Sequence, residues 1–228
     1  MSERPVPASW IEEVRSRLAA PAPRRLAPGE QREAAVLVPL FVDAGELWTL
    51  LTRRAEHLAK HRGQVAFAGG GLELGEDAWT GALREAEEEL GLPRESVLVL
   101  GQLDEVEAPT GYRIVPCVGA VPSQLQLTPD PGEIAEVYRV PLRALADPRL
   151  VEDRRIVFNG VPRQVRVYHF GAIQIWGVTA RIVQALLNIF VESQHGTKRR
   201  DFAEAQSFID RQIRDYERSL QAAERRLA

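Results

Sequence analysis

The segment from Gly70 to Leu92, GGLELGEDAWTGALREAEEELGL, places a helix pattern directly after a glycine-rich loop. Asp77 is a residue type that caps helix N-termini, and Gly91 followed by Pro93 is a typical helix end. Between these signals, apolar residues recur at helical spacing, namely Trp79, Ala82, Leu83, Ala86 and Leu90. The pattern predicts a helix between Asp77 and Gly91 that buries one face.

Three carboxylates of this segment, Glu85, Glu88 and Glu89, lie on one side of the predicted helix. In water, like charges at this spacing cost only about 0.2–0.5 kcal/mol per pair, so a solvated acidic face is one interpretation. In a partly buried cleft the repulsion rises to about 3 kcal/mol, and a hard divalent cation would remove it. Arg84 precedes Glu88 by four residues, the weaker order for a helical ion pair, which favours a role in orienting a carboxylate.

The full register of the segment is G-x5-E-x7-R-E-U-x-E-E-x-G-U, where U is apolar. It is met by Gly70, Glu76, Arg84, Glu85, Ala86, Glu88, Glu89, Gly91 and Leu92. This pattern resembles the signature of the Nudix hydrolases. The resemblance implies an α/β/α sandwich with a mixed β-sheet, and hydrolysis of a diphosphate that links a nucleoside to a second group, with Mg²⁺ or Mn²⁺ as cofactor.

The resemblance also implies a role for each residue of the signature. Arg84 would hold the glutamates in place, and Glu76 would support the geometry between loop and helix. Metal ions would neutralise and orient the diphosphate and lower the pKa of the attacking water. The implied metal ligands are Glu85, Glu88, Glu89 and the backbone carbonyl of Gly69.

A further carboxylate is expected to accept the proton of that water. The segment Glu133–Leu142, EIAEVYRVPL, resembles the loop and strand that supply such a glutamate in related enzymes. Either Glu133 or Glu136 fits this position, and the sequence leaves the choice between them open.

The segment Leu50–Gly70, LLTRRAEHLAKHRGQVAFAGG, resembles the motif L-L-T-x-R-[SA]-x3-R-x3-G-x3-F-P-G-G of the coenzyme A pyrophosphatase branch. Two positions depart from it, because Ala59 replaces an arginine and Ala68 replaces a proline. Coenzyme A has a 3′-phosphate besides its diphosphate, so its pocket needs additional positive charge. The implied substrate-binding residues are Arg54, Lys60, Arg62, Phe67, Gly69 and Gly70.

Hydrolysis of coenzyme A or acyl-coenzyme A, giving 3′,5′-ADP and 4′-phosphopantetheine or its acyl form, is therefore the expected activity. The missing arginine at Ala59 keeps a second class of substrate open, namely ADP-ribose, a nucleotide sugar or a dinucleotide. A third alternative is a non-catalytic binding or regulatory module with the Nudix fold. The complete set of three glutamates argues against that alternative.

Composition is that of an ordinary globular protein, with 45% hydrophobic and 27% charged residues among 228. The net charge of −3 predicts no general attraction to nucleic acid or anionic membranes. The single cysteine, Cys117, excludes an internal disulfide. Neither a signal peptide nor an apolar run of about 18 residues is present, so the expected location is cytoplasmic.

The chain divides into three expected parts. Residues 1–31 form an extension with a short helix and a Pro-rich linker, residues 32–192 form the Nudix domain, and residues 193–228 form an amphipathic helix. That last helix is expected to pack on the domain or to pair with a second copy in a homodimer. Within the domain, strands are expected at 34–42, 47–53, 97–103, 112–121 and 137–140, a hairpin at 155–158 and 165–170, and a helix at 179–191, with Thr179 as its N-cap and Trp176 in the core.

Overall fold

The computed structural model describes residues 8–27, 29–43, 46–58, 62–158 and 160–190. Its main sheet has eight strands. They are β1 (Arg32–Asp43), β2 (Glu46–Arg54), β3 (Val65–Ala66), β4 (Gly69–Gly71), β5 (Leu98–Gln102), β6 (Val106–Ala108), β7 (Tyr112–Ala120) and β8 (Ile134–Pro141). The central path is β3-β2-β1-β7-β5, while β4 pairs with β1, β6 with β7, and β8 with β2.

The sheet is mixed, as predicted. β1 and β7 run parallel, with Ala35 opposite Val115, and the other pairs of this sheet are antiparallel. Most of β1 is buried, which explains its nearly continuous apolar sequence AAVLVPLFV. The five strand ranges predicted for this sheet agree with the structure to within a few residues at each end.

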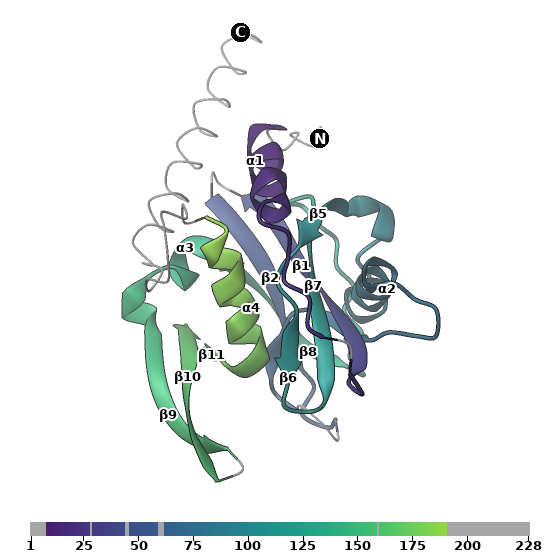
Figure 1. Cartoon of the computed structure of the whole chain (residues 1–228). Coiled ribbons are helices and arrows are strands. Elements are labelled where there is room, and N and C mark those ends of the chain that lie inside the picture. The colour runs from purple at the N-terminus through teal and green to yellow at the C-terminus, as the bar shows by residue number, and fades with distance from the viewer. Residues whose placement is uncertain (1–7, 28, 44–45, 59–61, 159, 191–228) are drawn as a thin grey trace, which may run out of the picture.

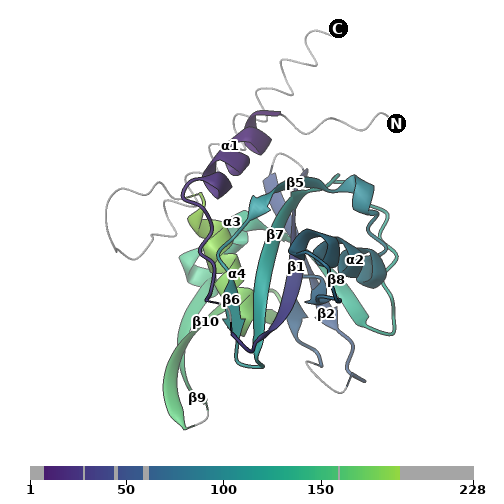
Figure 2. The same cartoon turned by 45° about the vertical axis from the view of Figure 1, so that its right-hand side comes forward.

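Helices cover both faces of the sheet (Figures 1 and 2). The helix α2 (Ala78–Leu90) packs on one face, in a core cluster with Leu37, Phe41 and Cys117. The helices α1 (Ala8–Ala19) and α4 (Gly177–Asn188) pack on the other face, in a second cluster with Val38 and Leu40. The alternation of β1 residues between the two clusters is the period-two pattern of a central strand. The fold is therefore the predicted α/β/α sandwich.

Three shorter helices connect these elements: α3 (Leu142–Leu145) and the 3₁₀ turns η1 (Arg94–Ser96) and η2 (Pro148–Leu150). A second sheet of three strands follows, in the order β11-β10-β9. Its members are β9 (Val151–Phe158), β10 (Val161–Phe170) and β11 (Ile173–Ile175). β9 and β10 form the predicted hairpin but extend beyond the predicted ranges, because polar residues on exposed strands hide the strand pattern.

Two predictions at the start of α4 are wrong. Thr179 is not the N-cap: the helix begins at Gly177, and the buried Thr179 hydroxyl donates a hydrogen bond to the Val65 carbonyl at 3.0 Å. Trp176 is not a core residue, since it is 48% exposed. The reason is the alternation of β11, in which Ile173 and Ile175 fill the core, so that Trp176 faces outward.

The N-terminal segment is closely joined to the body of the protein. Ile11, Val14 and Leu18 of α1 are buried in the same cluster as α4. The amide of Arg24 donates to Asp104 Oδ1 at 2.9 Å, and its carbonyl accepts from the Glu105 amide at 3.0 Å. The predicted helix at 193–228 lies outside the described residues. In the part of the chain that the structure describes, no helix is long and apolar enough to span a bilayer.

Candidate active site

The helix α2 has the two ends that the sequence predicts. Asp77 lies in an extended conformation, and its carboxylate accepts a hydrogen bond from the Thr80 amide at 2.8 Å. Gly91 adopts a left-handed conformation with φ of 63°, and its amide donates to the Glu87 carbonyl at 2.9 Å. Ala82, Ala86 and Leu90 face the core. These contacts fix the rotation of the helix, and with it the direction of its glutamates.

Two glycines of the loop, Gly69 and Gly70, lie close to neighbouring segments. A Cβ on Gly69 would lie 2.3 Å from the carbonyl oxygen of Ala35, which is backbone of β1 and cannot move aside. A Cβ on Gly70 would lie 2.4 Å from Glu85 Oε1. Gly69 thus lets the loop lie directly against β1, and Gly70 lets it lie beside Glu85 of α2 without displacing that carboxylate.

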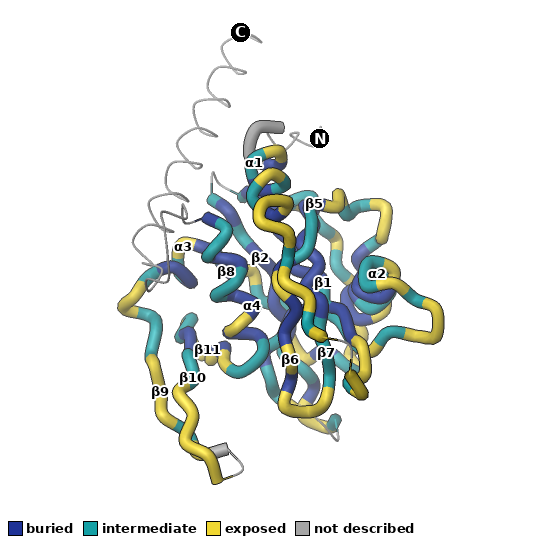
Figure 3. The backbone as a smooth tube through the Cα atoms, in the orientation of Figure 1, coloured by how far each residue is buried: buried dark blue, intermediate teal, exposed yellow. Residues whose placement is uncertain are grey.

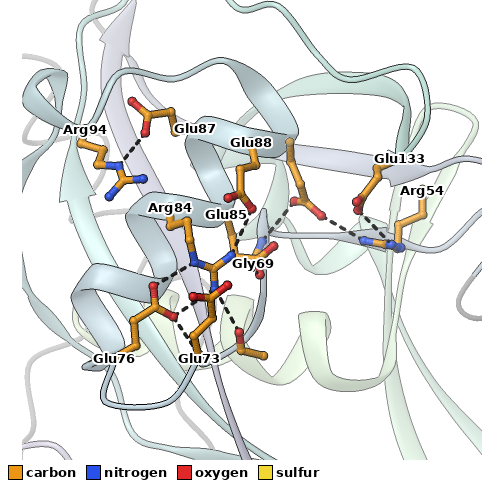
Figure 4. A network of polar contacts seen from close by, with 12 residues as sticks. Arg54, Gly69, Glu73, Glu76, Arg84, Glu85, Glu87, Glu88, Arg94 and Glu133 are labelled. Carbon is orange, nitrogen blue, oxygen red and sulfur yellow. Dashed lines mark hydrogen bonds and ion pairs between the residues drawn. The ribbon is translucent and has the colours of Figure 1, made fainter.

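Arg84 is the centre of one half of the cluster (Figure 4). Its guanidinium donates to both oxygens of Glu76, at 2.8 and 3.0 Å, and to Glu85 and Glu88, at 2.9 and 3.0 Å. A further bond reaches the Gly71 carbonyl at 3.1 Å. The hydrogen bond from Arg84 lowers the pKa of Glu76 to about 2, so this carboxylate is ionised at neutral pH. Arg84 therefore holds three carboxylates in fixed positions.

Glu89 lies in the other half and is the most buried member, with 3% of the residue exposed. One oxygen accepts from Arg54 Nη1 at 3.0 Å, and the other accepts from the Gly69 amide at 3.1 Å. Burial nevertheless raises the pKa of Glu89 to about 7, because these two donors do not offset the loss of water. Burial also raises the pKa of Glu85, against the opposing effect of Arg84.

The structure separates the two glutamates between which the sequence did not decide. Glu133 joins the cluster, because its carboxylate accepts from Arg54 Nη2 at 3.3 Å (Figure 4). Glu136 instead accepts from Arg53 Nη2 at 3.2 Å and from the Tyr138 hydroxyl at 2.8 Å. Only Glu133 is therefore linked through hydrogen bonds to the carboxylates of α2.

The cluster contains more negative than positive charge. Five carboxylates face two guanidiniums, which leaves three negative charges unbalanced when all are ionised. Oxygen donors with excess negative charge suit a hard divalent cation such as Mg²⁺ or Mn²⁺. Within the described ranges, no three acidic, His or Cys side chains are already arranged to hold a metal ion. A metal and the two arginines would thus compete for the same carboxylate oxygens.

The other residues predicted to bind substrate lie in different environments. Arg62 is exposed, while Lys60 lies outside the described residues. Phe67 is 3% exposed and packs in the core with α4, so its contact with substrate stays a prediction. Arg54 faces Glu89 and Glu133 instead of an open phosphate site. Sequence reasoning missed this pairing because the residues lie 35 and 79 positions apart, and no local pattern links them.

Known proteins match both the sequence and the fold. A model of the NUDIX domain matches residues 31–159, more than half of the chain. The Nudix hydrolase NudL of Photorhabdus laumondii is 38% identical over 167 residues, which cover 73% of this chain and 88% of that protein. NudL of Yersinia pestis is 38% identical over 156 residues, which cover 68% and 78%.

A MutT/nudix family protein from Enterococcus faecalis has the same fold, with a TM-score of 0.50 and 16% identity over 81% of this chain and 74% of that one. The family match extends from the first strand of the main sheet through the acidic helix to the β9 strand. Because it includes both the helix and the strands that position it, this chain belongs to the Nudix hydrolases and is a pyrophosphohydrolase of nucleoside diphosphate derivatives.

Proposed function

We propose that this enzyme hydrolyses the diphosphate bond of coenzyme A or acyl-coenzyme A, giving 3′,5′-ADP and 4′-phosphopantetheine or its acyl form. The supporting observation joins sequence and structure. The Leu50–Gly70 segment resembles the coenzyme A branch, and its Arg54 bonds directly to Glu89 of α2. Arg54, a residue typical of that branch, therefore lies against one of the family's carboxylates.

In this proposal Glu85, Glu88, Glu89 and the Gly69 carbonyl hold Mg²⁺ or Mn²⁺. When bound, the ion supplies charge neutralisation of the diphosphate and lowers the pKa of the attacking water. Arg84 fixes Glu85 and Glu88, and the Gly69 amide fixes Glu89. Glu76, ionised and held by two hydrogen bonds, keeps Arg84 from turning toward solvent. Such fixed ligands do not need to reorganise when the substrate arrives.

Glu133 is the proposed general base. Its side chain is about half exposed, so water can reach the carboxylate, and one of its oxygens accepts a hydrogen bond from Arg54. As the water oxygen bonds to phosphorus, the bond from phosphorus to the bridging oxygen breaks, and the leaving phosphate takes the electron pair. Glu133 accepts the proton of the water. Glu136, which accepts hydrogen bonds from Arg53 and Tyr138 instead, is the matched residue for comparison.

The 3′-phosphate of coenzyme A needs a cation outside the carboxylate cluster. Arg62 is exposed and makes no ion pair with another described residue, and Lys60 lies two positions before it in the sequence. We assign the 3′-phosphate to these two residues. Arg54 is less suited, because both ends of its guanidinium already face carboxylates.

The test is a substrate panel with Mg²⁺ and with Mn²⁺: coenzyme A, dephospho-coenzyme A, ADP-ribose and NADH, with products separated by chromatography. The expected result is the highest kcat/KM for coenzyme A, with release of 3′,5′-ADP. A preference for ADP-ribose or NADH would show that the enzyme acts on the second class of substrate, which the missing arginine at Ala59 keeps open. Equal rates with coenzyme A and dephospho-coenzyme A would reject a dedicated 3′-phosphate site.

A further inference from the structure

A large cavity lies away from the carboxylate cluster. Its volume is about 1240 Å³, and it is bounded by the β9–β10 hairpin, the first turns of α4 and the β6–β7 connection. None of the cluster residues lines it. Figure 1 shows α4 and α2 on opposite faces of the main sheet. Because α4 lines the cavity, the cavity lies on the other side of the sheet from the acidic helix.

The chemistry of this cavity does not suit a phosphate or a metal ion. Four arginines and four acidic residues line it, so its formal charge is zero. Its most unusual member is Trp176, which is 48% exposed and forms part of the wall. An exposed tryptophan among mixed charges is typical of a protein interface, where aromatic anchors contribute most of the binding energy.

The β9–β10 hairpin beside the cavity exposes apolar side chains to solvent. Its distal half extends away from the body, and most of its described residues are exposed (Figure 3). Val157 is 71% exposed and Val161 is 54% exposed. Two-stranded ribbons are only marginally stable without packing, and exposed edge strands with apolar residues tend to find a partner.

The hairpin tip cannot fill the cavity of its own molecule, because the same hairpin forms one wall of that cavity. A second copy can fill it. Each copy has one tip and one cavity. In two copies related by a twofold axis, each tip can enter the cavity of the other copy, and the assembly is then complete with two copies.

One side chain of the tip and one of the cavity wall carry opposite charges that are not engaged in ion pairs within the described residues. Arg155, on the same strand face as Val157, is exposed and makes no ion pair within the described residues. The carboxylate of Glu107, in the cavity wall, is likewise exposed and without an ion pair in that part of the chain. One unpaired cation on the tip and one unpaired anion in the cavity fit a contact between copies.

We infer that this protein forms a dimer in which the β9–β10 tip of each copy, with Arg155 and Val157, enters the cavity of the other beside Trp176 and Glu107. This dimer does not depend on the substrate proposal or on residues 193–228. The contact between Arg155 and Glu107 occurs twice in the dimer, so reversing the charge of either residue removes both contacts.

The test measures the mass of the full-length chain by light scattering and its dimer dissociation constant by sedimentation. Trp176→Ser is expected to give a monomer, and Trp176→Phe to retain the dimer. R155E and E107R are each expected to raise the dissociation constant by about tenfold or more. The double variant R155E/E107R is expected to return the dissociation constant toward the wild-type value. Circular dichroism and turnover of the substrate found in the panel confirm that each variant is folded.

A wild-type chain that is monomeric at every concentration would overturn the inference. So would a dimer that Trp176→Ser and the single charge reversals leave unchanged, since such a dimer would form through another surface. Failure of R155E/E107R to recover affinity, with both single variants weakened, would reject the proposed pairing of tip and cavity.

Discussion

Arg54 Nη1 donates to Glu89 Oε1 at 3.0 Å, and this contact joins the end of β2 to the most buried carboxylate of α2. The second nitrogen of the same guanidinium reaches Glu133. Arg54 thus neutralises two carboxylates that would otherwise repel each other and any incoming phosphate. A divalent cation bound to these carboxylates would supply the same neutralising charge, so Arg54 and the cation would compete for them.

Replacing Arg54 is expected to destabilise the metal-free protein and to tighten metal binding. Arg54→Gln leaves Glu89 buried without its cation, which costs about 3 kcal/mol of unfolding free energy at pH 8. The same change removes the competitor, so the affinity for Mn²⁺ rises severalfold. Denaturant unfolding and titration calorimetry measure the two effects. Arg62→Gln, at an exposed residue, serves as the control and should change neither; weaker Mn²⁺ binding in Arg54→Gln would contradict the competition.

The stability of the metal-free protein should fall as pH rises from about 5 to 7. The pKa of Glu89 is about 7 in the folded protein and 4.5 in the reference state, so the folded state binds the additional proton between these values. The unfolding free energy therefore decreases with pH in this window, by about 3 kcal/mol in total. Saturating Mn²⁺ should abolish the decrease, because the metal stabilises the ionised form.

Glu89→Gln is the matched test of that pH dependence. The amide cannot ionise, so unfolding curves recorded at pH 5 and pH 8 without metal should give more similar free energies than those of the wild type. If the variant retains the full decrease, the titration belongs to another group.

Glu88→Gln is expected to reduce kcat by about three orders of magnitude or more while leaving the fold intact, since removing a metal ligand removes its electrostatic stabilisation of the transition state. Glu88 is exposed enough that its removal costs little stability. Glu87→Gln is the control, because Glu87 lies on the same helix and pairs with Arg94 instead. Turnover assays and thermal unfolding of both variants separate the metal role from a general effect of charge, and full activity in Glu88→Gln would refute that role.

Gly70→Ala should impair catalysis more than stability. The new Cβ would press on Glu85 Oε1, a side-chain atom that can yield, so the carboxylate moves while the fold persists. Gly71→Ala has only ordinary contacts near 3.8 Å and is the matched control. The measurements are kcat and the melting temperature of each variant. Equal kcat in the two variants would show that the position of Glu85 is not critical.

Leu18→Ala should destabilise the whole protein by about 2–4 kcal/mol, because Leu18 is buried in the core shared with α4 and lies against Gly101. Glu12→Ala, on the exposed side of α1, should change stability by less than about 0.5 kcal/mol. Denaturant unfolding measures both. A small effect of Leu18→Ala would support the sequence-based boundary at residue 31, with the first part of the chain as a separate extension.

The local sequence predicted much of the fold. The ends of α2 follow from Asp77 and Gly91, since caps depend on neighbouring residues alone. The strands of the main sheet follow from runs of apolar residues, and the signature from Gly70 to Leu92 identifies the family. The short spacing of Glu85, Glu88 and Glu89 also predicted which residues would face one way, because helical geometry is fixed.

Contacts between distant segments decided the rest. The sequence pattern did not predict that Arg54 would lie against Glu89 and Glu133, that Glu133 and not Glu136 would join the cluster, or that Phe67 would be buried. Nor did it show that Trp176 would face outward beside the hairpin. Each of these depends on how β2, β8, β11 and α4 pack together. Local patterns determine secondary structure and helix faces, whereas burial and the pairing of charges arise only when the chain is folded.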